Sequence, residues 1–139
     1  MKKVISTFLT LALVASFVKA QSGPVMTFEK IEIDYGNIAL GADGVRVFKF
    51  KNTGTQSLVI KNARGSCGCT VPKWPSEPIG VGKTATIEVK YDTSRPGLFN
   101  KEVYVETNEA NPQHTLKIKG TVIEKKNDTV GANGSGSKR

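Results

Sequence analysis

The chain has 139 residues, two cysteines, 20 basic and 12 acidic residues, and a formal net charge of +8. The positive excess is concentrated at the two ends, because residues 21–124 contain 13 basic and 11 acidic residues. Charges of both signs alternate along this part and no basic block is interleaved with aromatic residues, so the charge does not indicate a nucleic-acid partner.

The first twenty residues have the layout of a secretory signal peptide. A positively charged start precedes an apolar run from Val4 to Val18, and small residues occupy the positions before a cleavage point at Gln21. The run is too short for a spanning helix, although an uncleaved anchor is the alternative interpretation. We therefore predict a signal peptide over residues 1–20, an exported protein that is periplasmic or secreted, and no membrane span after cleavage.

The other end of the chain is polar. Residues 125–139 consist mainly of Lys, Asn, Asp, Gly and Ser, and only Val130 and Ala132 are apolar. Such a segment cannot bury enough apolar surface to offset the entropy lost on ordering, so we predict a disordered tail. Residues 21–124 are then expected to form one domain with one modest core.

The hydrophobic pattern from Thr27 onward has a period of two, which is typical of half-buried strands. In the first segment apolar side chains alternate with acidic ones, and Gly36 and Asn37 are expected to end the strand. The positions expected to face the core are Ile31, Ile33 and Tyr35.

A second strand is predicted over residues 45–51. Phe48 and Phe50 share one face of this strand. Val45 and Val47 are out of phase with the two aromatic residues, which indicates a bulge or a change of face near Val47.

Turn residues fill positions 52–57, and the alternation restarts at Leu58 and Ile60. The next predicted strand runs from Cys67 to Val71 and contains both cysteines of the chain. The prolines that follow it exclude a central strand or a helix there; they are Pro72, Pro75 and Pro78.

The second half of the domain gives three further strands. The alternation is clearest from Thr84 to Tyr91, and the strand after it carries Val103 and Val105. The last strand contains Leu116, Ile118, Gly120 and Val122. About seven short strands with turns between them and no convincing helix predict an antiparallel β-sandwich of immunoglobulin type, with a small barrel as the alternative.

Several segments together resemble a bacterial family of exported proteins, the domain of unknown function DUF1573. The resemblance covers about residues 28–122 and implies an immunoglobulin-like fold, similar to pilus-chaperone-like and major-sperm-protein-like domains, and an exported location. It implies no reaction. The segments that carry it are Phe50 to Gly54, Ser66 to Thr70, the proline-containing stretch through Pro78, the turn at Gly82 and Lys83, and Tyr91 to Gly97.

The sequence offers little for an enzyme. A Cys–His dyad of His114 with Cys67 or Cys69 is formally possible, but His114 is expected at a loop-to-strand edge, where an exposed histidine needs no function. No carboxylate pair has a spacing that suggests acid–base catalysis, and Gly80 and Gly82 lead into a strand, unlike a phosphate-binding loop. We predict no catalytic residue and no cofactor.

The cysteines in Gly65-Ser66-Cys67-Gly68-Cys69-Thr70 are the exception. On a straight strand their Cα atoms would lie roughly 6.5–7 Å apart, at the upper limit for a disulfide, so a bridge needs a bent backbone, which Gly68 permits. An oxidising compartment favours such a bridge, whose short loop adds little stability. Cys67 and Cys69 are therefore either a switchable redox disulfide, or an inert bridge or small core residues beside Trp74.

A metal site is the third interpretation of the same pair. Two thiolates on one face can bind one soft ion such as Cu(I). A structural zinc site needs four ligands, and besides the cysteines the chain offers only His114 and a carboxylate. Met26 is a further thioether but is far away in the sequence. Cys67 and Cys69 are thus the metal candidates.

Trp74 is the only tryptophan, and it lies between two prolines. It is expected either to cap the sandwich or to anchor a partner. With no catalytic constellation, the predicted function is an exported, non-enzymatic, immunoglobulin-like binding or scaffold module with a protein partner in the periplasm or cell envelope. The alternative is a thiol-based redox or copper-binding protein that uses Cys67 and Cys69.

Overall fold

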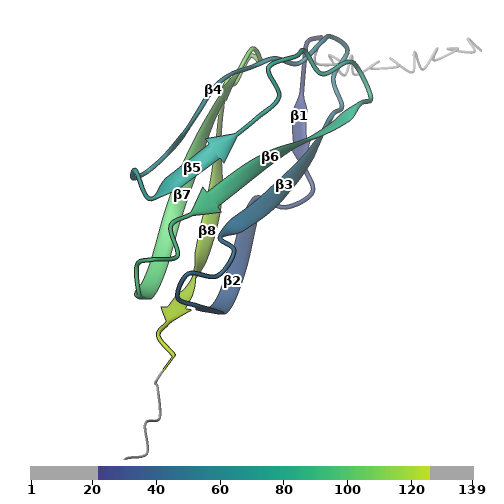
Figure 1. Ribbon diagram of the computed structural model, residues 1–139. Helices are drawn as coiled ribbons and strands as arrows, with labels where there is room; N and C mark the ends of the chain where they lie inside the picture. Colours follow the sequence, from purple (N-terminus) through teal and green to yellow (C-terminus); the bar gives the residue numbers. More distant parts are fainter. Residues whose placement is uncertain (1–21, 126–139) are drawn as a thin grey trace, which may run out of the picture.

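The computed structural model describes residues 22–125, which form eight strands and no helix. Figure 1 shows the strands in two packed layers. The strands are β1 (Met26–Phe28), β2 (Glu32–Ala39), β3 (Val45–Asn52), β4 (Ile60–Gly65), β5 (Thr70–Lys73), β6 (Thr84–Tyr91), β7 (Gly97–Thr107) and β8 (Gln113–Ile123).

The two sheets have four strands each, in the orders β1-β3-β6-β5 and β2-β8-β7-β4. All pairings are antiparallel except that of β2 with β8, which is parallel. This architecture confirms the predicted immunoglobulin-like sandwich, with eight strands in place of about seven.

The extra strand arises because the first predicted strand is split between the two sheets. Met26–Phe28 pairs with β3 in one sheet, and the chain then crosses to the other sheet, where Glu32 begins β2. Ile31 lies at this crossing and is 62% exposed, so its predicted inward position was wrong. Tyr35 does face the core, as expected.

The predicted end of this strand at Gly36 was also wrong, because β2 continues to Ala39. The register against β8 shifts between Asp34 and Asn37. Gly36 has a φ of 63° in this bulge, a backbone conformation that costs glycine little. A turn-type residue thus bends the strand without ending it.

Near Val47 the irregularity that the sequence indicated is absent. Residues 45–51 pair with β6 in an unbroken register, so β3 has no bulge there. Phe48 and Phe50 point into the core, and Val47 is 49% exposed on the outer face.

The core lies between the sheets and is made by the inward side chains of the long strands. The alternation predicted for β6 and β8 is confirmed, since their inward positions are buried, apart from the half-buried Ala85. The ring of Tyr91 stacks on the ring of Phe99, and the ring of Tyr35 packs edge-to-face against that same Phe99 ring. The Tyr35 hydroxyl donates to the Gly44 carbonyl, and burial raises its pKa to about 12.

The turn after β3 is organised by Asn52, which is fully buried. Its Nδ2 donates to the carbonyls of Gln56 and Ile79, and its Oδ1 accepts the amide hydrogens of Gly54 and Val25. One side chain therefore joins three separate segments. The sequence identified residues 52–57 as a turn but not this role of Asn52.

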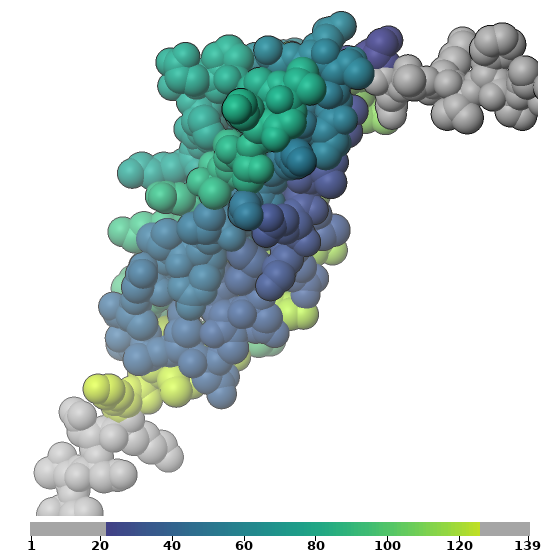
Figure 2. Space-filling view, turned by 90° about the vertical axis from the view of Figure 1, so that its right-hand side faces the viewer, coloured from purple at the N-terminus to yellow at the C-terminus, as the bar shows by residue number. Residues whose placement is uncertain are grey.

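In Figure 2 purple and blue atoms of the first three strands cover the lower and middle part of one side of the sandwich, and teal and green atoms of later residues cover its upper part. The first and the last described residues lie at opposite ends of the sandwich (Figure 1). The predicted signal peptide and all of the predicted tail except Lys125 lie outside the described residues. Within the described range, no helix has the length and apolarity needed to cross a membrane.

Candidate functional site

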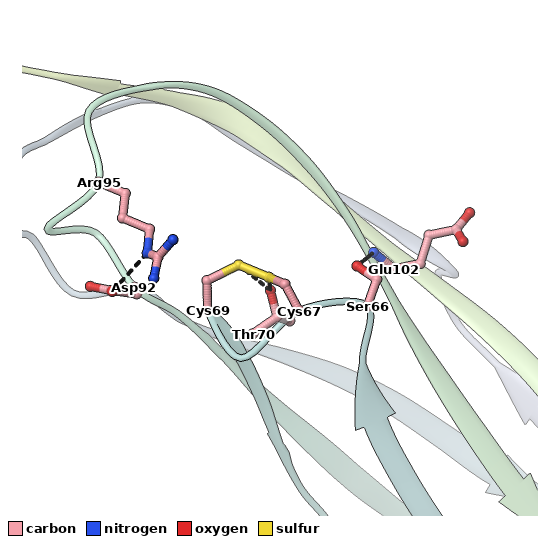
Figure 3. Close-up of a disulfide and its surroundings, with 7 residues drawn as sticks. All are labelled: Ser66, Cys67, Cys69, Thr70, Asp92, Arg95 and Glu102. Atoms are coloured by element: carbon pink, nitrogen blue, oxygen red, sulfur yellow. Dashed lines mark hydrogen bonds and ion pairs between the residues drawn. A yellow bond between two sulfur atoms is a disulfide. The ribbon is translucent and has the colours of Figure 1, made fainter.

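The two cysteines lie in the tight turn between β4 and β5, and not on a strand as predicted. β4 ends at Gly65 and β5 begins at Thr70. The turn brings the Cα atoms of Cys67 and Cys69 to 5.2 Å, within the ordinary range for a disulfide, and the structure joins the two sulfur atoms in one (Figure 3).

The glycine that this turn requires is Gly65. A Cβ atom there would collide with the carbonyl oxygen of Thr70, whereas a Cβ on Gly68 would meet nothing within 4 Å. Gly68 also lies outside the set of glycines with a positive φ. The bend therefore does not depend on Gly68, contrary to expectation, but on close approach of the backbone at Gly65.

Backbone hydrogen bonds fix the turn on both sides. The Ser66 amide donates to the Glu102 carbonyl on β7 at 2.8 Å, and the Glu102 amide donates to Ser66 Oγ at 3.1 Å. On the other side the Asp92 amide, just after β6, donates to the Cys69 carbonyl at 2.9 Å. The turn is thus attached to both sheets through contacts that involve no sulfur atom.

Asp92 also forms an exposed polar cluster next to Cys69, seen in Figure 3 as its ion pair with Arg95. Hydrogen bonds from the Ser94 hydroxyl and amide, and then from Arg95, keep the pKa of the Asp92 carboxyl below its usual value. The carboxylate therefore stays charged near the turn at neutral pH.

The two sulfur-bearing residues differ in exposure. Cys69 is 5% exposed and belongs to the core, whereas Cys67 is only half-buried at its margin. Thr70 is 2% exposed, and its Oγ1 lies 3.7 Å from Cys67 Sγ and 3.8 Å from Cys69 Sγ. Disulfide sulfurs carry no hydrogen, so the single hydrogen of the Thr70 hydroxyl is the only donor for the two contacts.

The structure does not bring the other proposed metal ligands to the cysteines. Met26 is buried at the start of β1. Among residues 22–125 no group of three or more His, Cys, Asp or Glu side chains is arranged to hold a metal ion. Reduced Cys67 and Cys69 alone would supply two thiolates, which suits a two-coordinate soft cation and not zinc.

His114 is the second residue of β8 and so lies at the expected loop-to-strand edge, but its side chain is half-buried and not exposed as expected. Its Nε2 is 2.6 Å from Oε2 of Glu109, and its ring packs edge-on against Phe28. The same carboxylate accepts the Met26 amide and the Thr107 hydroxyl. His114 thus belongs to a partly buried network that ties β1 to the β7–β8 loop, and it forms no dyad with a cysteine.

Trp74 follows β5 directly. Its half-buried ring packs against the core, and it also lines an open groove of about 610 Å³ on the outer side of β5 and β6. The residues that line the groove with it are Pro72, Lys73, Pro75, Ser76, Thr86 and Glu88.

The free edge of β5 offers no backbone donor for an added strand. In an antiparallel pair every second residue of a strand directs its backbone amide toward the neighbouring strand. The hydrogen bond from the Asp92 amide to the Cys69 carbonyl shows which residues these are, so the amides of Val71 and Lys73 face β6. The Thr70 amide is used within the turn, and Pro72 has no amide hydrogen. This edge is therefore protected against strand pairing, and a partner at this place would contact side chains.

The backbone is similar to solved structures that share its fold at low sequence identity. A protein of unknown function from Porphyromonas gingivalis W83 has a TM-score of 0.65 at 14% identity, over 76% of this chain and 50% of that one. The seventh PapD-like (ASH) domain of human CEP192 has a TM-score of 0.55 at 15% identity, over 80% of this chain and 96% of that one. The chain therefore spans half the length of the Porphyromonas protein.

A third structure is the CsuC–CsuE complex of Acinetobacter baumannii, described as a chaperone–tip adhesion subunit pre-assembly complex. One of its chains has a TM-score of 0.51 at 11% identity, over 73% of this chain and 57% of that one. At these identities the likeness establishes the fold alone.

No curated protein matches the chain significantly. The family model described as "Protein of unknown function (DUF1573)" matches residues 26–122, which is most of the chain and almost all of the sandwich. The cysteine turn, the groove beside Trp74 and, apart from Ile123 at the end of β8, all eight strands lie within this range. The chain therefore belongs to the DUF1573 family.

Proposed function

We propose that the chain is an exported, non-enzymatic binding or scaffold module that holds a protein partner in the periplasm or cell envelope. The observation that carries this proposal is the groove of about 610 Å³ beside Trp74. Grooves that combine an aromatic wall with a few polar groups are typical binding sites, and tryptophan is enriched among the residues that dominate binding energy.

The partner that fits the groove is an extended polypeptide segment with an apolar anchor side chain. The ring of Trp74 and two prolines supply an apolar wall, and the opposite charges of Lys73 and Glu88 give the rim no strong preference for one sign. Because the edge of β5 lacks amide donors, the segment contacts the groove through side chains and does not extend the sheet.

Two further observations support the proposal. The signal-peptide pattern of residues 1–20 supports export. The similar fold in the CsuC–CsuE complex, which by its description joins a chaperone to a subunit, supports a protein as the partner. The exposed Val71, on the outer face of β5, adds apolar surface next to the groove.

The test is capture of envelope proteins by the full chain, with photo-crosslinking from a probe at Ser76 in the groove. Thr86→Arg fills the groove from an exposed position of β6 and should abolish the crosslink and the capture. Thr84→Arg is the matched control, because Thr84 is also exposed on β6 but does not line the groove. This control should capture the partner like the unmodified chain.

Two results would contradict the proposal. Equal capture by Thr86→Arg and by the unmodified chain would show that the groove is not the binding surface. Substrate turnover by the purified chain that Thr86→Arg leaves intact would contradict the non-enzymatic function.

A further inference from the structure

The disulfide in the β4–β5 turn contributes little to holding the turn together. Its loop encloses a single residue, Gly68, so the bridge removes little entropy from the unfolded chain. The hydrogen bonds of Ser66 with Glu102 and of Asp92 with Cys69 fix the turn from both sides. Reduction of the bridge therefore leaves two thiols close together on an intact scaffold.

The surroundings also distinguish the two sulfur atoms. Gly68 is exposed and has open space around it, and Cys67 is reached by solvent, whereas Cys69 and Thr70 are buried. A thiolate attacks a disulfide at the sulfur atom that it can reach, and the other sulfur leaves. The turn thus exposes one sulfur to attack and encloses the other.

We propose that Cys67–Cys69 is a site of thiol–disulfide exchange with a cysteine pair of an exported polypeptide. This proposal goes beyond the binding function, since the exchange does not require the groove. A partner thiolate bonds to Cys67 Sγ, the Cys67–Cys69 bond breaks, and Cys69 Sγ leaves with the electron pair as a thiolate that takes a proton from solvent.

The second step completes the exchange. The partner's second thiolate attacks the partner sulfur of the mixed disulfide, so Cys67 leaves as a thiolate. The partner's two thiols have then become a disulfide, and Cys67 and Cys69 have become two thiols. Two electrons pass from the partner to this chain, and no other oxidant is needed for the single exchange.

Thr70 favours the departure of Cys69. Its hydroxyl is buried, lies 3.8 Å from Cys69 Sγ, and has only the two sulfur atoms as side-chain partners. A hydrogen bond donated to a thiolate stabilises the charged form, and a better stabilised thiolate leaves faster. The buried hydroxyl thus replaces part of the stabilisation that water would give to an exposed thiolate at Cys69.

β5 connects this bridge to the groove described above. The strand begins at Thr70, beside the bridge, and ends at Lys73, whose neighbour Trp74 lines the groove. A polypeptide held beside Trp74 is thereby tethered near Cys67, which raises the local concentration of its thiols.

The experiment uses the oxidised full chain and reduced glutathione as the probe thiol. After acid quenching, mass spectrometry with fragmentation between the two cysteines locates the glutathione. We expect glutathione on Cys67 in about tenfold excess over Cys69, because only Cys67 is accessible. A synthetic peptide with two cysteines should then be oxidised in a one-to-one ratio with reduction of the chain.

Substitutions of Thr70 test the second part of the proposal. Thr70→Val should slow reduction by glutathione about tenfold, whereas Thr70→Ser, which keeps the hydroxyl, should react like the unmodified chain. Thr84→Val, the same substitution at an exposed position of β6 outside the groove, is the control and should not change the rate. Thr86→Arg, which blocks the groove, should still be reduced by glutathione at the rate of the unmodified chain, which separates this proposal from the binding function.

Glutathione on Cys69, or equally on both cysteines, would overturn the assignment of the attacked sulfur. A bridge that glutathione reduces only after the chain is unfolded would overturn the exchange itself. These mapping results need only the unmodified chain, so they hold even if Thr70→Val does not fold. A rate for Thr70→Val equal to that of the unmodified chain would overturn the role of the hydroxyl.

Discussion

Two turns of the sandwich are built in different ways. Residues 52–57, after β3, are organised by the buried side chain of Asn52, which makes four hydrogen bonds to backbone groups. Residues 65–70, between β4 and β5, are fixed by backbone bonds and by the close approach at Gly65. None of these contacts involves the side chain of Cys67 or Cys69.

This difference separates stability from reactivity. A buried amide with four partners cannot change without leaving backbone groups unsatisfied in the core. A disulfide on a turn that is already fixed can open and close while its surroundings stay in place. The first turn is thus suited to maintaining the fold, and the second to exposing a reactive group.

The largest effect is expected from Asn52→Ala. The substitution leaves the carbonyl of Gln56 and the buried amide of Gly54 without their side-chain partner, so the free energy of unfolding should fall by about 3 kcal/mol. Urea denaturation measures this change. The exposed neighbour Thr53 is the control, and Thr53→Ala should cost less than about 1 kcal/mol. Equal losses of unfolding free energy in the two variants would contradict the structural role of Asn52.

Gly65→Ala tests whether close approach of the backbone shapes the cysteine turn. Its Cβ atom would collide with the Thr70 carbonyl, so we expect a loss of about 2 kcal/mol. Gly68→Ala, in open space three residues later, should change the stability by less than about 0.5 kcal/mol. Thermal unfolding of the two variants measures both losses of stability. A larger loss for Gly68→Ala than for Gly65→Ala would show that the bend depends on Gly68.

The double substitution Cys67→Ser with Cys69→Ser removes the bridge and keeps the size of both side chains. Because the loop is so short, we expect the free energy of unfolding to fall by at most about 2 kcal/mol. The far-ultraviolet circular dichroism spectrum should match that of the unmodified chain. An unfolded double variant would mean that the bridge holds the turn.

Ser66→Ala should have the smallest effect. It removes the bond from the Glu102 amide to Ser66 Oγ at an exposed position but keeps the backbone bond from Ser66 to Glu102. We expect a loss of about 0.5 kcal/mol in denaturant unfolding. A loss as large as that of Asn52→Ala would show that a side chain also organises this turn.

Much of the fold could be predicted from periodicity. The alternation in residues 84–91 and in the last strand depends only on which side chains face the core, and it was confirmed. Strand boundaries were harder, because the chain crosses from one sheet to the other at Ile31, although Ile31 has the same spacing of two to Ile33 as Ile33 has to Tyr35. The same spacing misplaced Cys67 and Cys69 on a strand, although a turn can also set residues two apart side by side.

The remaining features could not be read from local sequence. The burial of Asn52 depends on partners that range from Val25 to Ile79. The fixing of the cysteine turn depends on Glu102 and Asp92, which lie on other strands or at their ends. Trp74 was predicted as a packing or a binding residue, and the structure places it against both the core and an open groove. Such contacts arise only when distant segments meet.

Amide hydrogen exchange of the oxidised and the reduced chain tests most directly whether the cysteine turn is independent of its bridge. The amides to follow are those of Ser66 and Asp92, which donate to Glu102 and Cys69. We predict that both keep their protection after reduction, because their bonds do not involve sulfur. Loss of protection at both amides on reduction, with the rest of the sandwich unchanged, would contradict the account.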